Sequence, residues 1–217
     1  MKLYAHPFSS YCQKALIALY ENDTPFDYLT LSPDHADVVA EHEALWPLKR
    51  FPVLTDAGRT VAEATVIIEY LDLHHPGPVR MVPEDPKAAL EVRMLDRIFD
   101  NYVMTPMQKI VGDQIRLAGS RDQQGVGEAR RLLDTTYAWL DGVLKSARWG
   151  AGEAFTLADC AAAPSLFYAD WVHPIADEFP NVKGYRERLL GRPSFARAVD
   201  EARPFRALFP PGAPDRD

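Results

Sequence analysis

A proline-rich segment divides this sequence into two parts with different patterns. Residues 75–86 contain four prolines and Gly77. Proline has a fixed φ and no amide hydrogen, so a segment of this composition excludes a helix or a central strand. We therefore predict a linker at residues 76–86, between an N-terminal domain at 1–75 and a C-terminal domain at 87–217. A chain of 217 residues is long enough for two such domains.

Before the linker, short apolar runs alternate with segments of helical periodicity. The patterns predict strands at residues 2–5, 26–28, 51–55 and 59–62, and helices at 10–21, 34–45 and around 66–71. Asp56-Ala57-Gly58 predicts a tight turn between the last two strands. This order of elements predicts a mixed sheet with helices on its faces, which is an α+β domain.

After the linker, the whole pattern is helical. Leu90, Met94, Ile98 and Tyr102 fall on one stripe of a helix that Pro106 is expected to kink or end. Further helices are expected at residues 123–146, 156–172, 181–190 and 194–203, followed by an extended tail at 204–217. Thr156-Leu157-Ala158-Asp159 has the form of a capping box, so Asp159 is expected to be structural. The second domain is predicted to be an all-helical bundle.

Charge and cysteine content restrict the class of protein. The formal net charge of −7 argues against a surface for nucleic acids or anionic membranes, both of which need a basic footprint. The two cysteines, Cys12 and Cys160, lie too far apart for a metal-binding motif and suit a reducing compartment. The opening residues lack the pattern of a signal peptide. We expect a soluble, cytoplasmic protein with no metal.

The first candidate site is Ser9-Ser10-Tyr11-Cys12, where the first strand meets the first helix. Unpaired N–H groups and the helix dipole favour an anion at a helix N-terminus, and a thiolate is such an anion. A serine hydroxyl placed there can donate a hydrogen bond to the sulfur of a ligand. The simpler interpretation is that Ser9 or Ser10 only caps the helix.

Two further candidate sites follow along the chain. Phe51-Pro52 begins a strand directly after the basic pair Lys49-Arg50, and proline in a sheet is confined to edges, strand starts or bulges. Its isomer is left open by the sequence, because only about 5–6% of X–Pro bonds are cis. Glu63 opens the last helix of the first domain, either to complement the helix dipole or to bind the ammonium group of a ligand.

Together these segments resemble the glutathione transferase family, over nearly the whole chain. The residues that carry the resemblance are Leu3-Tyr4, Ser9 to Cys12, Phe51 to Leu54, Glu63, Ile67, Ile68, Tyr70, Leu71, and Thr156 to Asp159. The resemblance implies a thioredoxin-like N-terminal domain followed by an all-α C-terminal domain. It also implies glutathione as co-substrate, a role in detoxification and a homodimer.

The resemblance also implies roles for individual residues. Ser9, with Ser10 beside it, matches the catalytic serine of theta- and zeta-like classes, whereas the tyrosine of other classes would fall at Ala5. Pro52 matches the cis-proline of the family, and the backbone of Phe51 would pair with the cysteinyl unit of glutathione. The remaining glutathione-binding positions are Lys49 and Arg50 for the glycine carboxylate, and Glu63 and Ala64 for the γ-glutamyl end.

The sequence departs from the family pattern at Ala64, where a serine is usual. The change removes a hydroxyl donor to a carboxylate, worth about 0.5–1.5 kcal/mol or more. Thr65 is the nearest hydroxyl that could take its place. The usual asparagine and glycine before the cis-proline are Trp46 and Lys49 here.

The expected reaction is attack by the glutathione thiolate on a small apolar electrophile. Methionine and aromatic side chains adapt to varied apolar ligands. The second substrate is therefore expected at the kinked helix and at the apolar helix near the end of the chain, against Tyr102, Met104, Met107, Tyr168 and Trp171. The competing interpretation of these five residues is that they belong to the core.

Three other functions stay open at this point. One is a non-catalytic binding module, like the transferase-like domains of translation elongation factor gamma subunits. Another is a glutathione-dependent isomerase, because Ser9-Ser10 resembles the serine pair of the zeta class. The third is a thiol reductase that uses Cys12 or Cys160, although both cysteines are expected to be buried and inert.

Overall fold

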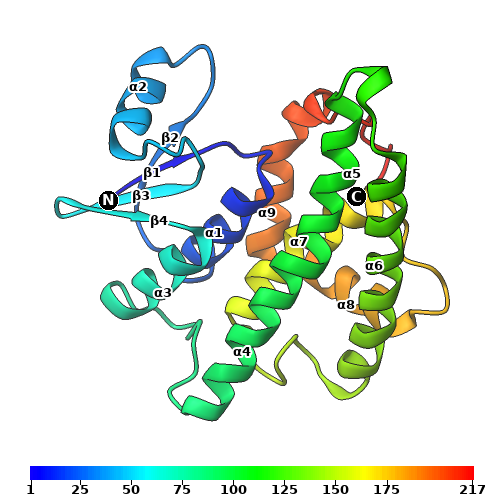
Figure 1. Ribbon diagram of the computed structural model, residues 1–217. Helices are drawn as coiled ribbons and strands as arrows, with labels where there is room; N and C mark the ends of the chain where they lie inside the picture. Colours follow the sequence, from blue (N-terminus) through cyan, green and yellow to red (C-terminus); the bar gives the residue numbers. More distant parts are fainter.

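The N-terminal part of the molecule is a small four-stranded sheet with three helices. The structure, a computed structural model, describes all 217 residues (Figure 1). The strands are β1 (Lys2–Ala5), β2 (Asp27–Thr30), β3 (Val53–Asp56) and β4 (Arg59–Ala62), and the helices are α1 (Ser10–Glu21), α2 (Ala36–Leu45) and α3 (Ala64–His74). The element order predicted from the sequence is confirmed. The third strand starts two residues later than predicted, after Pro52, which has no N–H for the ladder.

The sheet has the order β2-β1-β3-β4, in which β1 and β2 are parallel and the other pairs are antiparallel. The side chains of Leu3, Tyr4 and Ala5 are fully buried because β1 is a central strand with helices on both faces. In Figure 1, α1 and α3 lie on the side of the sheet that faces the second domain, and α2 lies on the opposite side. The hairpin between β3 and β4 turns at Ala57 and Gly58, both with positive φ.

The C-terminal part is helical throughout. It contains α4 (Pro86–Ile98), α5 (Thr105–Ile115), α6 (Gln123–Val143), α7 (Leu157–Val172), α8 (Pro180–Leu190) and α9 (Pro193–Ala202), with a π-helical segment, η1 (Phe99–Met104), and the short 3-10 segments η2 (Ala118–Ser120), η3 (Leu144–Ser146) and η4 (Arg203–Leu208). Helix α7 lies at the centre, and nearly all of its residues are buried. None of the helices combines the length and the apolar character needed to cross a membrane.

The start of α7 confirms the predicted capping box. Asp159 accepts hydrogen bonds from the backbone N–H of Thr156 and of Gly150, at 2.8 Å each, and from the hydroxyl of Tyr185 at 2.6 Å. The carboxylate is fully buried, so these donors replace the water that it loses. Asp159 is therefore structural, as the sequence predicted.

The apolar stripe predicted on α4 lies largely on the exposed face of this helix. Leu90, Met94 and Tyr102 are 68%, 48% and 48% exposed. The buried face instead contains the apolar residues Ala89, Val92, Leu95 and Phe99, together with Asp96 and Asp100. These two carboxylates pair with a buried lysine of the first domain, so the inner face of the helix is partly polar.

Pro106 does not end the helix that contains it. The helix instead passes through the π-helical turn of η1 and continues as α5, with Pro106 near the start of α5. The N–H of Thr105 bonds the carbonyl of Asp100, five residues back, so the wider turn accommodates a proline ring that would clash in a regular α-helix. The predicted extended tail is also corrected, because Arg203–Leu208 is a 3-10 helix.

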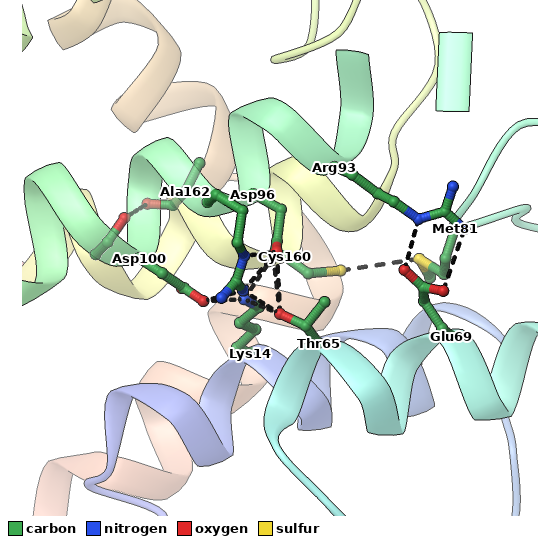
Figure 2. Close-up of polar contacts among 11 residues, drawn as sticks. Lys14, Thr65, Glu69, Met81, Arg93, Asp96, Asp100, Cys160 and Ala162 are labelled. Carbon is green, nitrogen blue, oxygen red and sulfur yellow. Dashed lines mark hydrogen bonds and ion pairs between the residues drawn. The ribbon is translucent and has the colours of Figure 1, made fainter. Parts of the chain in front are cut away.

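The two domains share a continuous interface. Ile17, Ala18 and Ile68, from α1 and α3, belong to the same apolar core as the buried residues of the C-terminal helices. Beside this core, the Lys14 ammonium lies 2.5 Å from Asp96 Oδ1 and 2.7 Å from Asp100 Oδ2, and it donates to Thr65 Oγ1 at 2.9 Å (Figure 2). The Lys14 side chain is only 1% exposed. A buried cation with two buried carboxylates therefore joins α1 to α4.

We expect Lys14→Met to destabilise the protein by about 3 kcal/mol, because it removes the buried cation from Asp96 and Asp100 and leaves them only the ion pairs with Arg97, whose side chain is 49% exposed. Urea unfolding followed by circular dichroism measures this change. The matched control is Arg93→Met, which removes an exposed ion pair between α4 and Glu69 of α3, also at the interface of the two domains (Figure 2). The control is expected to cost about 1 kcal/mol or less. Equal losses in the two variants would contradict the importance of the buried cluster.

Candidate functional site

A cleft of about 540 Å³ lies between the two domains. Its walls come from the β1–α1 junction, the loop before β3, the start of α3 and the α4–η1–α5 helix. The lining residues are Ser9, Tyr11, Trp46, Lys49, Arg50, Phe51, Pro52, Glu63, Ala64, Arg97, Asp100, Asn101 and Gln108. The structure thus brings together seven of the predicted site residues, Ser9, Lys49, Arg50, Phe51, Pro52, Glu63 and Ala64.

Ser9 is the N-cap of α1. Its Oγ accepts a long hydrogen bond of 3.4 Å from the N–H of Cys12, which leaves the hydroxyl proton free to be donated elsewhere. The capping role and a role toward a ligand are therefore compatible in one side chain. Ser10 differs, because it is buried and does not line the cleft.

The loop before β3 presents free backbone groups. The Phe51–Pro52 peptide bond is cis, and neither the N–H nor the C=O of Phe51 has a hydrogen-bond partner within the protein. An extended peptide can pair with such groups as an added strand does. Lys49 and Arg50 place positive charge beside this backbone, although the Lys49 ammonium also lies 2.8 Å from Glu43.

The start of α3 forms a second helix N-terminus on the cleft. Glu63 is its N-cap and makes no side-chain capping bond or ion pair, so both its carboxylate and the first N–H groups of α3 are free. Thr65 cannot replace the serine missing at Ala64, because its hydroxyl is bound to Lys14, Asp96 and Arg97.

Two residues of the cleft have a strained backbone. Lys49 and Glu63 adopt φ of 55° and 71°, in the left-handed region that residues with a Cβ avoid. Such strain costs on the order of 1–3 kcal/mol per residue and concentrates at binding sites. Both residues lie among those that line the cleft. Of the four residues other than glycine with positive φ, two therefore lie among the charges of the cleft, and the other two, Asp23 and Ala57, lie in turns outside it.

The wall formed by the second domain was missed by the sequence analysis. It consists of Arg97, Asp100, Asn101 and Gln108. Asp100 Oδ2 binds Lys14, whereas Oδ1 is buried without any hydrogen-bond partner, and burial raises the pKa of this carboxyl. The available signal was the pair Asp100-Asn101, two polar residues within an apolar helical segment.

Tyr11 is the remaining polar group near Ser9 that the sequence analysis left without a role. Burial raises the pKa of its hydroxyl to about 12. The hydroxyl therefore stays protonated at neutral pH and can only act as a neutral hydrogen-bond partner in the cleft. Tyr11 therefore contributes no negative charge to the cleft.

None of the five residues expected to contact a second substrate lines the cleft. Met104, Met107 and Tyr168 are buried in the core, and Tyr102 is exposed on the stripe of α4 described above. Trp171 is half-buried and packs against Phe167 and Phe209. These residues are absent from the cleft for one reason. The apolar side chains of these helices fill the interior of the bundle, so the side chains that line the cleft are polar.

Both cysteines are fully buried. Burial raises the pKa of Cys12 to about 12, which outweighs the lowering by the hydrogen bond from the N–H of His6. Burial also raises the pKa of Cys160 well above its usual value. Neither thiol is therefore ionised at neutral pH, and neither lines the cleft.

Comparisons with known proteins identify relatives of both domains. Residues 3–79 match the family model of the glutathione S-transferase N-terminal domain, and residues 97–193 match that of the C-terminal domain. The chain is 30% identical to the Uncharacterized GST-like protein YibF of Escherichia coli (strain K12), over 91% of this chain and 97% of that protein. It is 23% identical to a probable maleylacetoacetate isomerase of Caenorhabditis elegans, over 93% and 94% of the two chains.

Solved structures resemble this fold over most of its length. A glutathione S-transferase from Methylobacterium radiotolerans, in complex with glutathione sulfonate, superposes with a TM-score of 0.78 at 32% identity, covering 91% of this chain and 93% of that one. A glutathione S-transferase from Methylobacillus flagellatus, with glutathione bound, gives a TM-score of 0.80 at 25% identity, covering 91% and 98%.

We expect neither cysteine to react in the native protein, because burial holds the thiol of Cys12 protonated up to a pH of about 12. Titration with a chromogenic disulfide at pH 8 is expected to show almost no fast-reacting thiol, and both thiols after unfolding in guanidinium. A Cys12→Ser variant with an unchanged native reaction rate is the control. Rapid labelling of Cys12 would contradict this description and would reopen redox chemistry at that residue.

Proposed function

Since the chain belongs to the glutathione S-transferase family, we propose that it binds glutathione in the cleft and activates its thiol for attack on a small electrophile. The observation that carries the proposal is the hydroxyl of Ser9, whose proton is uncommitted at the N-terminus of α1. The proposed place of action is the cytoplasm, where glutathione keeps thiols reduced.

The charges of the cleft match those of glutathione, which has one ammonium and two carboxylates. The free carboxylate of Glu63 and the unpartnered Oδ1 of Asp100 suit the ammonium. The free N–H groups at the start of α3 suit the γ-glutamyl carboxylate, since Ala64 still offers its backbone N–H. The backbone of Phe51 would pair with the cysteinyl unit, and Lys49 with Arg50 would bind the glycine carboxylate.

The chemistry follows from the placement of the sulfur. In this arrangement, Ser9 donates a hydrogen bond to the glutathione sulfur, and the positive end of the α1 dipole favours the thiolate over the thiol. The thiolate then attacks the electrophile. Only four of the thirteen lining residues are hydrophobic, and the second-domain wall contributes Arg97, Asn101 and Gln108. An electrophile with polar substituents fits these walls better than the purely apolar one expected from the sequence.

A second candidate function is glutathione-dependent isomerisation. The resemblance to a probable maleylacetoacetate isomerase and the Ser9-Ser10 pair favour it. Both functions need the same ionised thiol, so the distinction lies in the second substrate. Assays with maleylacetoacetate and with chlorodinitrobenzene separate them. The burial of Cys12 weighs against a thiol reductase, and the unpaired Glu63 carboxylate in the cleft weighs against a module that binds no ligand.

The proposal includes a homodimer. Leu90, Met94 and Tyr102 form an exposed apolar stripe on α4 and η1, and Val66 on the neighbouring α3 is 52% exposed. The ion pair between Arg93 and Glu69 holds these two helices side by side. Monomeric proteins seldom expose a contiguous apolar surface of this kind, so we assign it to contact with a second copy.

We expect Met94→Glu to convert the dimer into a monomer, because it places a charge in the centre of this apolar contact. Sedimentation velocity at micromolar concentration measures the change in mass. The control is Leu208→Glu, which places the same charge at a leucine on η4 that is 61% exposed. A wild-type protein that sediments as a monomer would refute the homodimer, and an unaffected dimer in Met94→Glu would place the contact elsewhere.

The function is tested at the two adjacent serines. Ser9→Ala is expected to lower the rate of conjugation by about 10²-fold, because a lost hydrogen-bond donor to developing charge costs that much. Glutathione affinity, measured by calorimetry, should change less than about threefold, because binding rests on the other groups of the cleft. Ser10→Ala, which alters a buried serine outside the cleft, is expected to change the rate only slightly.

Two results would overturn the proposed function. An absence of any heat on titration of the wild-type protein with glutathione would leave a scaffold role as the better description. If Ser10→Ala instead of Ser9→Ala abolished the reaction, the catalytic assignment would pass to Ser10.

A further inference from the structure

The loop that presents Ser9 has every backbone polar group bonded. The N–H of His6 donates to Cys12 Sγ at 3.4 Å, the N–H of Phe8 donates to His6 Nδ1 at 3.2 Å, and the N–H of Ser9 donates to the His6 carbonyl at 3.0 Å. Pro7 has no N–H, and the Ser9 carbonyl accepts from the N–H of Gln13 in the first turn of α1. Two carbonyls remain, those of Pro7 and Phe8.

These two carbonyls are bound by side chains from the two domains. Gln13 Nε2 donates one hydrogen bond of 3.0 Å to the Pro7 carbonyl and another of 3.0 Å to the hydroxyl oxygen of Tyr168. The Tyr168 hydroxyl donates its own proton toward the Phe8 carbonyl at 3.4 Å. The two amide protons of Gln13 and the phenolic proton of Tyr168 are thus all used.

Tyr168 connects the second domain to this loop. It lies on α7 and is 3% exposed, and burial raises the pKa of its hydroxyl, so the hydroxyl remains a donor at neutral pH. Its ring packs edge-on against Phe8, with the ring centroids 5.5 Å apart, and against Phe167 at 5.0 Å. The position of the hydroxyl is therefore fixed by the core of the bundle.

We propose that Tyr168 and Gln13 are positioning residues that hold the His6–Ser9 loop so that the Ser9 hydroxyl points at the glutathione sulfur. This inference rests on the function proposed for Ser9. A hydrogen bond that stabilises a charge needs its donor held to within a fraction of an ångström, and supporting hydrogen bonds provide that precision. Tyr168, which the sequence analysis expected to contact a second substrate, thus acts instead on the His6–Ser9 loop from the core of the second domain.

The inference predicts a change in thiol activation separate from binding. The proposed binding groups, on the loop before β3, the start of α3 and Asp100, lie outside the His6–Ser9 loop. Loosening the loop is therefore expected to leave glutathione affinity nearly constant. The pKa of the bound thiol should rise, because a misdirected hydroxyl stabilises the thiolate less.

The test is Tyr168→Phe, which removes the hydroxyl and keeps the ring. We expect kcat to fall about tenfold and the pKa of enzyme-bound glutathione to rise by about one unit, with the KM for glutathione within about twofold of wild type. Thiolate absorbance as a function of pH, at saturating glutathione, measures the pKa. Gln13→Met, which removes the amide at similar length, should give the same shift, and the double variant should add little.

Tyr137→Phe is the matched control. Tyr137 lies on α6, is fully buried, and has a hydroxyl without a hydrogen-bond partner, so the same atom is removed from the core of the same domain. Its kcat and thiol pKa are expected to equal those of wild type. Thermal unfolding and glutathione calorimetry on each variant verify that the protein is folded and the cleft intact.

The outcomes separate this inference from the function on which it rests. If wild type lowers the pKa of bound glutathione and Tyr168→Phe lowers it equally, the positioning role is refuted and the proposed function stands. A rise in KM with an unchanged thiol pKa in Tyr168→Phe also refutes it, because the tyrosine would then only support the fold. If wild type binds glutathione without lowering its pKa, both proposals fail.

Discussion

The cleft exists because two domains of different architecture are held at a fixed distance, and a buried lysine is central to that contact. Lys14 leaves water completely, a cost that only close carboxylates can offset. Asp96 and Asp100 lie one turn apart on the helix that enters the second domain, so both can reach the same ammonium. The pairing is directional, whereas apolar contacts alone would allow the two domains to slide. The pairing of Lys14 with Asp96 and Asp100 therefore determines which face of α4 points into the protein.

The same contact places charge where the candidate ligand needs it. One oxygen of Asp100 is bound to Lys14 and Arg97, and the other is buried without a partner in a residue that lines the cleft. Opposite it lie the N-termini of α1 and α3, which supply unpaired N–H groups and positive potential. Basic side chains follow along the loop before β3. A ligand with charges of both signs along its length can match this series, and a uniformly charged one cannot.

The loop that presents Ser9 is contacted from the interior of the second domain. Its loop has no regular secondary structure, yet each of its backbone polar groups is satisfied, one of them by the hydroxyl of Tyr168. The aromatic rings around Tyr168 pack closely, so the bundle interior fixes the loop from behind. The catalytic geometry that we propose in the first domain would thus depend on packing in the second, although the chain segments lie far apart in the sequence.

Local signals in the sequence determined the outline of this protein. The order of strands and helices, the capping box at Asp159 and the burial of both cysteines could all be predicted, because each depends on neighbours a few residues away. The position of Ser9 at a helix N-terminus is also a local feature, and its catalytic role stays a prediction. The tertiary structure alone decided the inward face of α4, the wall formed by Arg97, Asp100 and Asn101, and the burial of Met104, Met107 and Tyr168. These features depend on partners such as Lys14 that lie more than eighty residues away from Asp96 and Asp100. An analysis of hydrophobic periodicity places a carboxylate on the solvent-facing side of a helix. Only the folded structure shows that Asp96 and Asp100 point inward, where Lys14 supplies the opposite charge.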